Sequence, residues 1–109
     1  PTIFGDGRQT RDFVFVDDVV DAFARGAERG GGLVLNIGTG HETSVTDLFT
    51  LMAGATGFEG APARAPARPG ELARSALDPG RAHIHLGWEP WTPLEEGLAR
   101  TVGWFAGRR

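Results

Sequence analysis

The stretch TIFGDGRQTRDFVFVDDVV, residues 2–20, decides the fold class. It opens with a short apolar run closed by Gly5-Asp6-Gly7, which is typical of the end of a strand followed by a turn. The run Phe13–Val16 is β-branched and aromatic, and it predicts a second strand. Asp17 and Asp18 then stand where an N-cap and a first-turn acid belong, ahead of an amphipathic helical pattern. Strands that alternate with helices predict an α/β fold.

The next segment continues this alternation. Gly30–Gly32 ends the first helix, and Leu33–Ile37 predicts a compact buried strand. Ser44–Asp47 resembles a capping box, with Asp in place of Glu, and begins a helix that Gly57 ends. Residues 60–70 are rich in Ala, Pro and Arg and predict at most one extended edge strand.

Two further helices are expected near the C-terminus. Asp78-Pro79 provides an N-cap and a proline at the first helical position, and Gly87 closes that short helix. Thr92 and Glu95 predict a reciprocal capping box at the start of the last helix. The sequence thus predicts a small α/β domain over residues 1–109, with short strands and about four helices. So small a sheet leaves open edges, so we expect partner strands upstream of this chain.

Composition limits the classes of function. The net charge of −3 argues against nucleic acid or an acidic membrane as the main partner, and no apolar stretch is long enough to span a bilayer. Cysteine is absent, which fits a reducing, cytoplasmic setting and leaves no cysteine-ligated metal site. All eleven basic side chains are Arg, and the chain contains neither Tyr nor Lys.

Spacing alone leaves several kinds of site open. The pair Asp17-Asp18 has the groups for acid–base chemistry, but carboxylates at the head of a helix more often serve as caps and dipole partners. Gly38-Thr39-Gly40 follows a predicted strand and precedes a helix, so it is a weak candidate for a phosphate turn. Arg11 and Arg68 lie on predicted loops. Two guanidiniums converging there would suit a diphosphate, and the alternative is that both are ordinary surface arginines.

Taken together, several blocks resemble the NAD-dependent epimerase/dehydratase family of extended short-chain dehydrogenase/reductases. The blocks are residues 2–19, Asn36–Gly40 with Ser44-Val45, Arg68-Pro69-Gly70-Glu71, and the closing Leu86-Gly87-Trp88 with the Leu94–Leu98 helix. In effect the resemblance covers the whole chain, as the C-terminal substrate-binding domain of that family, and is closest to the UDP-glucose 4-epimerases.

The resemblance implies a binding role for particular residues. The strand Thr2-Ile3-Phe4 would lie along a uracil, with the Phe4 ring stacking on the base. Arg11 and Arg68 would bind the diphosphate, and Gln9 would lie beside the sugar or the diphosphate. Glu71 would accept hydrogen bonds from the ribose hydroxyls, although the family usually has Asp at this position.

The resemblance also implies what this chain lacks. Members of the family bind NAD through a Rossmann half and catalyse with a Tyr-x-x-x-Lys pair, which a chain without Tyr and Lys cannot contain. We therefore expect no catalytic residue, no metal and no NAD on this chain. A longer parent would supply the cofactor, and the isolated domain would be inactive and prone to self-association. A dTDP-glucose 4,6-dehydratase, a UDP-sugar decarboxylase, a non-catalytic nucleotide-sugar-binding module and a bare folding fragment remain as alternatives.

Overall fold

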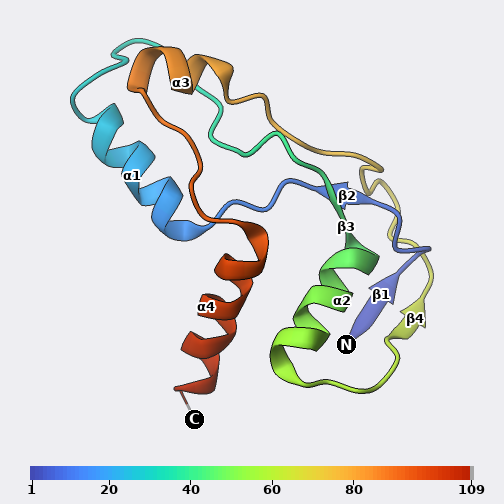
Figure 1. Cartoon of the computed structure of the whole chain (residues 1–109). Helices are drawn as coiled ribbons and strands as arrows, with labels where there is room; N and C mark the ends of the chain where they lie inside the picture. The colour runs from blue at the N-terminus through green and yellow to red at the C-terminus, as the bar shows by residue number, and fades with distance from the viewer. Residues whose placement is uncertain (109) are drawn as a thin grey trace.

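The computed structural model describes residues 1–108, and these form four helices and four short strands (Figure 1). This confirms the predicted α/β class with about four helices. The strands are β1 (Thr2–Phe4), β2 (Thr10–Arg11), β3 (Thr43–Ser44) and β4 (Ala63–Ala65). The helices are α1 (Val16–Gly26), α2 (Val45–Thr56), α3 (Gly80–Leu86) and α4 (Leu94–Ala106).

The strands associate in two separate pairs. β1 and β4 are parallel, with Thr2 opposite Ala63 and Phe4 opposite Ala65. β2 and β3 are antiparallel and very short. Parallel strands need a long crossover, which the chain between β1 and β4 supplies by passing through α1 and α2 (Figure 1). The predicted edge strand between residues 60 and 70 is confirmed as β4.

The prediction of a strand over Phe13–Val16 is wrong. Phe15 is extended, with φ −72° and ψ 143°, but it is the N-cap of α1, and Val16 already lies in the helix. Asp17 and Asp18 occupy the first turn rather than the cap position, and no side chain caps this helix. A β-branched run becomes a strand only when a neighbouring strand pairs with its backbone, and residues 13–15 have no such neighbour among the described residues.

The predicted strand over Leu33–Ile37 is wrong for the same reason. This segment is irregular in the structure. Leu35 and Ile37 still pack against the main buried cluster, while Val34 is 83% exposed. The cluster consists of Ala22, Ala82, Leu86 and Trp88. Alternation of partly buried and exposed side chains therefore exists here without a hydrogen-bonded ladder.

The predicted ends of α2 and α3 are confirmed, except that α3 begins one residue later than expected. The Ser44 hydroxyl accepts a hydrogen bond from the Asp47 amide at 3.0 Å, and Gly57 closes α2 in the left-handed conformation at φ 74°. Gly87 closes α3 in the same way. At the start of α3, Pro79 is the N-cap and not the first helical residue.

The capping box expected at Thr92 is wrong, because this side chain has another partner. The Thr92 hydroxyl donates to Asp18 Oδ1 at 2.8 Å, and α4 begins after Pro93 without a side-chain cap. Asp18 is fully buried and also accepts from the Trp91 and Thr92 amides, both at 3.1 Å. The Trp88 indole donates to the Asp18 carbonyl at 2.8 Å. Asp18 therefore fastens the start of α1 to the loop that leads into α4.

One face of α1 is apolar and exposed. Val16, Val20 and Phe23 are 62%, 58% and 76% exposed, and their spacing places them along a single stripe of the helix. Such a stripe usually packs against another element. Among the described helices, none combines the length and the hydropathy that a bilayer crossing requires.

Candidate functional site

The β1–β4 pair brings an aromatic ring and a guanidinium together. Phe4 ends β1, and the Gly5 amide donates to the Ala65 carbonyl at 2.9 Å, which extends the pairing by one bond. The chain beyond β4 then returns over β1, so that the guanidinium carbon of Arg68 lies 4.0 Å from the centroid of the Phe4 ring. This is a cation–π contact.

A cavity of about 410 Å³ lies beside this contact. Gln9 forms part of its wall, and the Gln9 side-chain amide donates to the Phe4 carbonyl at 3.0 Å. The size falls within the range of small-molecule sites. The side chains around it are mostly polar or charged, and the lining comprises Phe4, Gly5, Asp6, Arg8, Gln9, Ala67, Arg68, Glu71, Leu72, Ala73 and Arg74.

Arg11 is braced against the segment that follows Arg68. Its Nη1 donates to the carbonyls of Thr10 at 2.6 Å and Leu72 at 2.8 Å. Its Nη2 lies 3.4 Å from Glu71 Oε1, and the side chains of both partners are about one-third exposed. Arg11 does not line the cavity itself, but it contacts Glu71, which does.

Most of the residues predicted to bind a ligand thus meet in one place. Phe4, Gln9, Arg68 and Glu71 line the cavity, and Arg11 contacts its wall. Ile3 is 3% exposed, so its side chain belongs to the core. Thr2 is exposed at the start of β1.

The phosphate turn considered at Gly38-Thr39-Gly40 is wrong, because a carboxylate already occupies it. Asp12 accepts hydrogen bonds from the amides of Thr39 and Gly40 at 2.9–3.0 Å, and from the amide of Leu77 at 3.3 Å. Burial raises the pKa of Asp12, but the hydrogen bonds from Thr39, Gly40 and Leu77 outweigh burial, and the pKa lies below its ordinary value. Asp12, which directly follows β2, thereby joins the Thr39–Gly40 loop and the segment at Leu77 to the end of that strand.

A second carboxylate near the cavity was not anticipated from the sequence. Glu42 accepts from Arg74 Nε at 2.8 Å and from Arg74 Nη2 at 2.6 Å, and Thr10 Oγ1 donates to the same carboxylate at 2.7 Å. The hydrogen bonds from Arg74 and then Thr10 lower the pKa of Glu42 to about 2. Nothing in the local sequence predicts this contact, since Glu42 and Arg74 are far apart in the chain.

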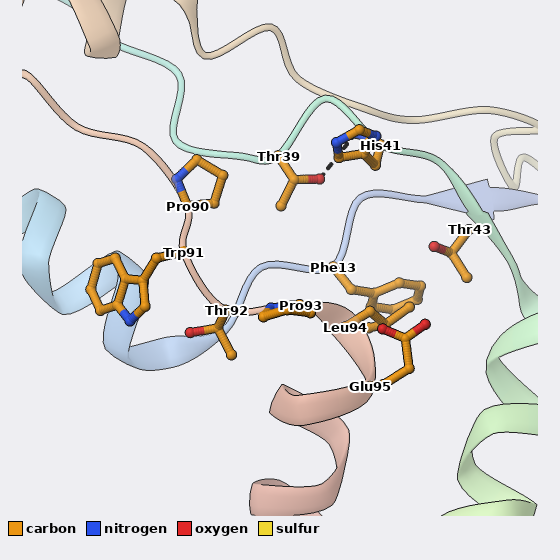
Figure 2. A pocket seen from close by; sticks show the side chains of 10 residues that line it. All are labelled: Phe13, Thr39, His41, Thr43, Pro90, Trp91, Thr92, Pro93, Leu94 and Glu95. Carbon is orange, nitrogen blue, oxygen red and sulfur yellow. Dashed lines mark hydrogen bonds between the residues drawn. The ribbon is translucent and has the colours of Figure 1, made fainter.

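A separate cavity of about 450 Å³ lies between the start of α4 and the loop after Gly38 (Figure 2). Figure 2 shows His41 and Thr39 on one side and Glu95 on the other, with the His41 amide bonded to Thr39 Oγ1 at 3.0 Å. None of the residues predicted to bind a ligand lines it. Among residues 1–108, no group of three potential metal ligands is close enough to hold an ion.

Comparisons with known proteins assign the family. The model of a family described as GDP-mannose 4,6 dehydratase matches residues 1–101. The chain belongs to this family. Its relatives include NAD-dependent epimerases, and it is 56% identical to the UDP-glucose 4-epimerase of Mycolicibacterium smegmatis over 94% of its own length and 33% of the relative's.

Solved structures of the same family superpose on nearly the whole chain. UDP-glucose 4-epimerase from Thermotoga maritima, crystallised with UDP-glucose, matches with a TM-score of 0.95 and 47% identity over 97% of this chain and 34% of that one. MoeE5 in complex with UDP-glucuronic acid and NAD matches with a TM-score of 0.92 and 37% identity over 100% of this chain and 37% of that one. The chain corresponds to the C-terminal part of these epimerases, about a third of their length.

NAD is present in some of these solved structures, among them MoeE5 with UDP-glucuronic acid. The one glycine turn considered for phosphate, Gly38–Gly40, directs its amides at Asp12. The sequence contains neither Tyr nor Lys.

Proposed function

We propose that this chain is the substrate-binding part of an NAD-dependent UDP-sugar 4-epimerase, and that the cavity beside Phe4 takes the UDP moiety. One observation carries the proposal. Phe4, Gln9, Arg68 and Glu71, which are far apart in sequence, line a single cavity, and Arg11 is bonded to its wall. UDP-sugars in the matching epimerase structures make a nucleoside diphosphate the natural ligand to test.

The chemistry of the cavity suits a nucleoside diphosphate. The Phe4 ring offers a π-face for the base, and the Arg68 guanidinium now covers one face of that ring. Phosphate oxygens are stronger partners for a guanidinium than an aromatic ring, so the diphosphate would draw Arg68 away and release the ring. Glu71, placed against Arg11, would accept hydrogen bonds from the ribose hydroxyls.

The role proposed for this chain is positioning. Holding a nucleotide sugar in one orientation over a nicotinamide removes much of the entropic barrier to reaction, even when the binding part supplies no reacting group. The cofactor and the Tyr–Lys pair would come from the rest of a longer protein. We expect the isolated chain to show no epimerase turnover.

The apolar stripe on α1 supports a packing role for this surface. Val16, Val20 and Phe23 are more than half exposed, which suits contact with the remaining two-thirds of an epimerase. In its absence we expect the chain to self-associate at high concentration. Sedimentation of the wild type and of Phe23→Ser over a range of concentrations measures this, and a concentration-independent monomer would contradict it.

Titration calorimetry with UDP, dTDP and GDP tests the proposed ligand. We expect UDP to bind most tightly, and Arg68→Ala to weaken it about tenfold or more, as loss of a charge-assisted hydrogen bond predicts. Arg81→Ala removes the same charge from α3, outside the cavity, and serves as the matched control. No binding at millimolar UDP would contradict the proposal, and equal binding of dTDP would favour a dehydratase.

A further inference from the structure

Arg74 lies in the wall of the same cavity and has a fixed backbone. The Thr10 amide donates to the Ala73 carbonyl at 2.9 Å, and the Ser75 amide donates to the Thr10 carbonyl at 3.2 Å. These bonds form a parallel β-bridge between Thr10 and Arg74. Thr10, which follows Gln9 in the chain, therefore holds the backbone of Arg74 in place.

The side chain of Arg74 is also fixed, although it is 78% exposed. Glu42 accepts from both Nε and Nη2, which is the two-pronged geometry that orients a guanidinium plane. Thr10 Oγ1 donates to Glu42 Oε1 and so holds the carboxylate. Within residues 1–108, the hydrogen bonds of Arg74 use Nε and Nη2 and leave the Nη1 donors free.

The two arginines already assigned to the proposed site, Arg11 and Arg68, are differently engaged. Arg11 directs its Nη1 donors at two backbone carbonyls. Arg68 lies over the face of the Phe4 ring, and it would have to move for a base to stack on that face. Of the arginines that line the cavity, Arg8, Arg68 and Arg74, only Arg74 has its guanidinium hydrogen-bonded to a carboxylate within residues 1–108, and its Nη1 donors are unused.

We infer that Arg74 is a third arginine of the nucleotide site, oriented by Glu42 and Thr10 to bind an oxygen of the diphosphate. The inference rests on the proposed function, because it assumes that a nucleoside diphosphate enters this cavity. Glu42 and Thr10 are positioning residues, since they act through Arg74.

Titration of the 109-residue chain with UDP and with uridine tests this assignment. We expect Arg74→Ala to weaken UDP about tenfold and to leave uridine unchanged, since uridine carries no phosphate. Arg74→Lys should restore little, because an ammonium cannot span both oxygens of Glu42. Glu42→Gln should weaken UDP about threefold, and the control Arg81→Ala should match the wild type.

The outcomes separate the inference from the proposed function. If Arg74→Ala binds UDP as the wild type does, or loses UDP and uridine equally, Arg74 does not contact the diphosphate, and the proposed function stands. If the wild type does not prefer UDP to uridine, both fail. A measurement that needs no variant is the NMR resonance of the Arg74 Nε–H, which UDP should shift and uridine should not. An unmoved resonance at saturating UDP would overturn the inference.

Discussion

Replacement of Asp18 should destabilise this chain far more than replacement of its neighbour Asp17. Both carboxylates lie in the first turn of α1. Asp18 is fully buried and accepts hydrogen bonds from the Trp91 amide, the Thr92 amide and the Thr92 hydroxyl. Asp17 is half exposed and pairs with Arg100 at 2.9 Å on the surface.

The magnitude follows from the donors that lose their acceptor. A buried donor left without a partner costs about 1–3 kcal/mol, and the hydroxyl of Thr92 can turn toward another acceptor. Two such donors give about 2–6 kcal/mol, and because both amide bonds are only partly buried, Asp18→Ala should lower the free energy of unfolding by about 2–4 kcal/mol. A chain of this length is typically stable by about 5 kcal/mol at the low end, so this is a large fraction. Asp17→Ala should lower it by about 0.5 kcal/mol at most.

An isosteric variant separates the hydrogen bonds from the charge. In Asp18→Asn the amide oxygen can accept from the Trp91 and Thr92 amides, while the NH₂ group donates to the Thr92 hydroxyl. We expect it to lose only about 1 kcal/mol. Urea unfolding followed by tryptophan fluorescence measures all three variants, since Trp88 is buried beside Asp18. Equal losses in Asp17→Ala and Asp18→Ala would refute the reasoning.

Three further outcomes are expected. Because the folded pKa of Asp12 lies below its ordinary value of 3.8, its carboxylate stabilises the fold fully above that pH and loses this effect as the pH falls through the folded pKa. Acid unfolding should therefore be less steep in Asp12→Asn than in the wild type, and Asp12→Asn should also be less stable at pH 7. Gly57→Ala should lower the free energy of unfolding by about 1–2 kcal/mol, because φ is 74° at this position. Urea unfolding measures this, and an unchanged stability would contradict it. Gly54→Ala, in the interior of α2 with open space where a Cβ would lie, should instead stabilise by about 0.5–1 kcal/mol, and a lower unfolding midpoint would contradict this.

The helices of this fold could be predicted from local sequence, whereas of the four strands only β1 and β4 were expected where they lie. Ser44 and Gly57 fix the ends of α2 through contacts within the helix or next to it. Leu33–Ile37 has the composition of a strand, yet a strand needs a second backbone, and none pairs with it among residues 1–108. Thr92 does not cap α4, because its hydroxyl donates to the buried carboxylate of Asp18, which is distant in sequence.

The residues of the candidate site were likewise predicted only in part. Family resemblance named Phe4, Arg68 and Glu71, and the structure gathers them at one cavity. Glu42 and Arg74 carried no local signal, because their pairing depends on how the chain after β4 returns beside Thr10. Contacts made by tertiary folding, between side chains that are ordinary in isolation, are what sequence patterns miss.

The parallel pairing of β1 with β4 has a consequence for biosynthesis. Thr2 is synthesised before its partner Ala63, which follows only after α1 and α2 have been made. The wall that carries Phe4 and Arg68 therefore cannot close until β4 has been made, and closing so wide a loop is slow compared with forming a helix. Until β4 has been made, the backbone of Thr2–Phe4 lacks this partner, and an unpaired strand edge is prone to non-native pairing.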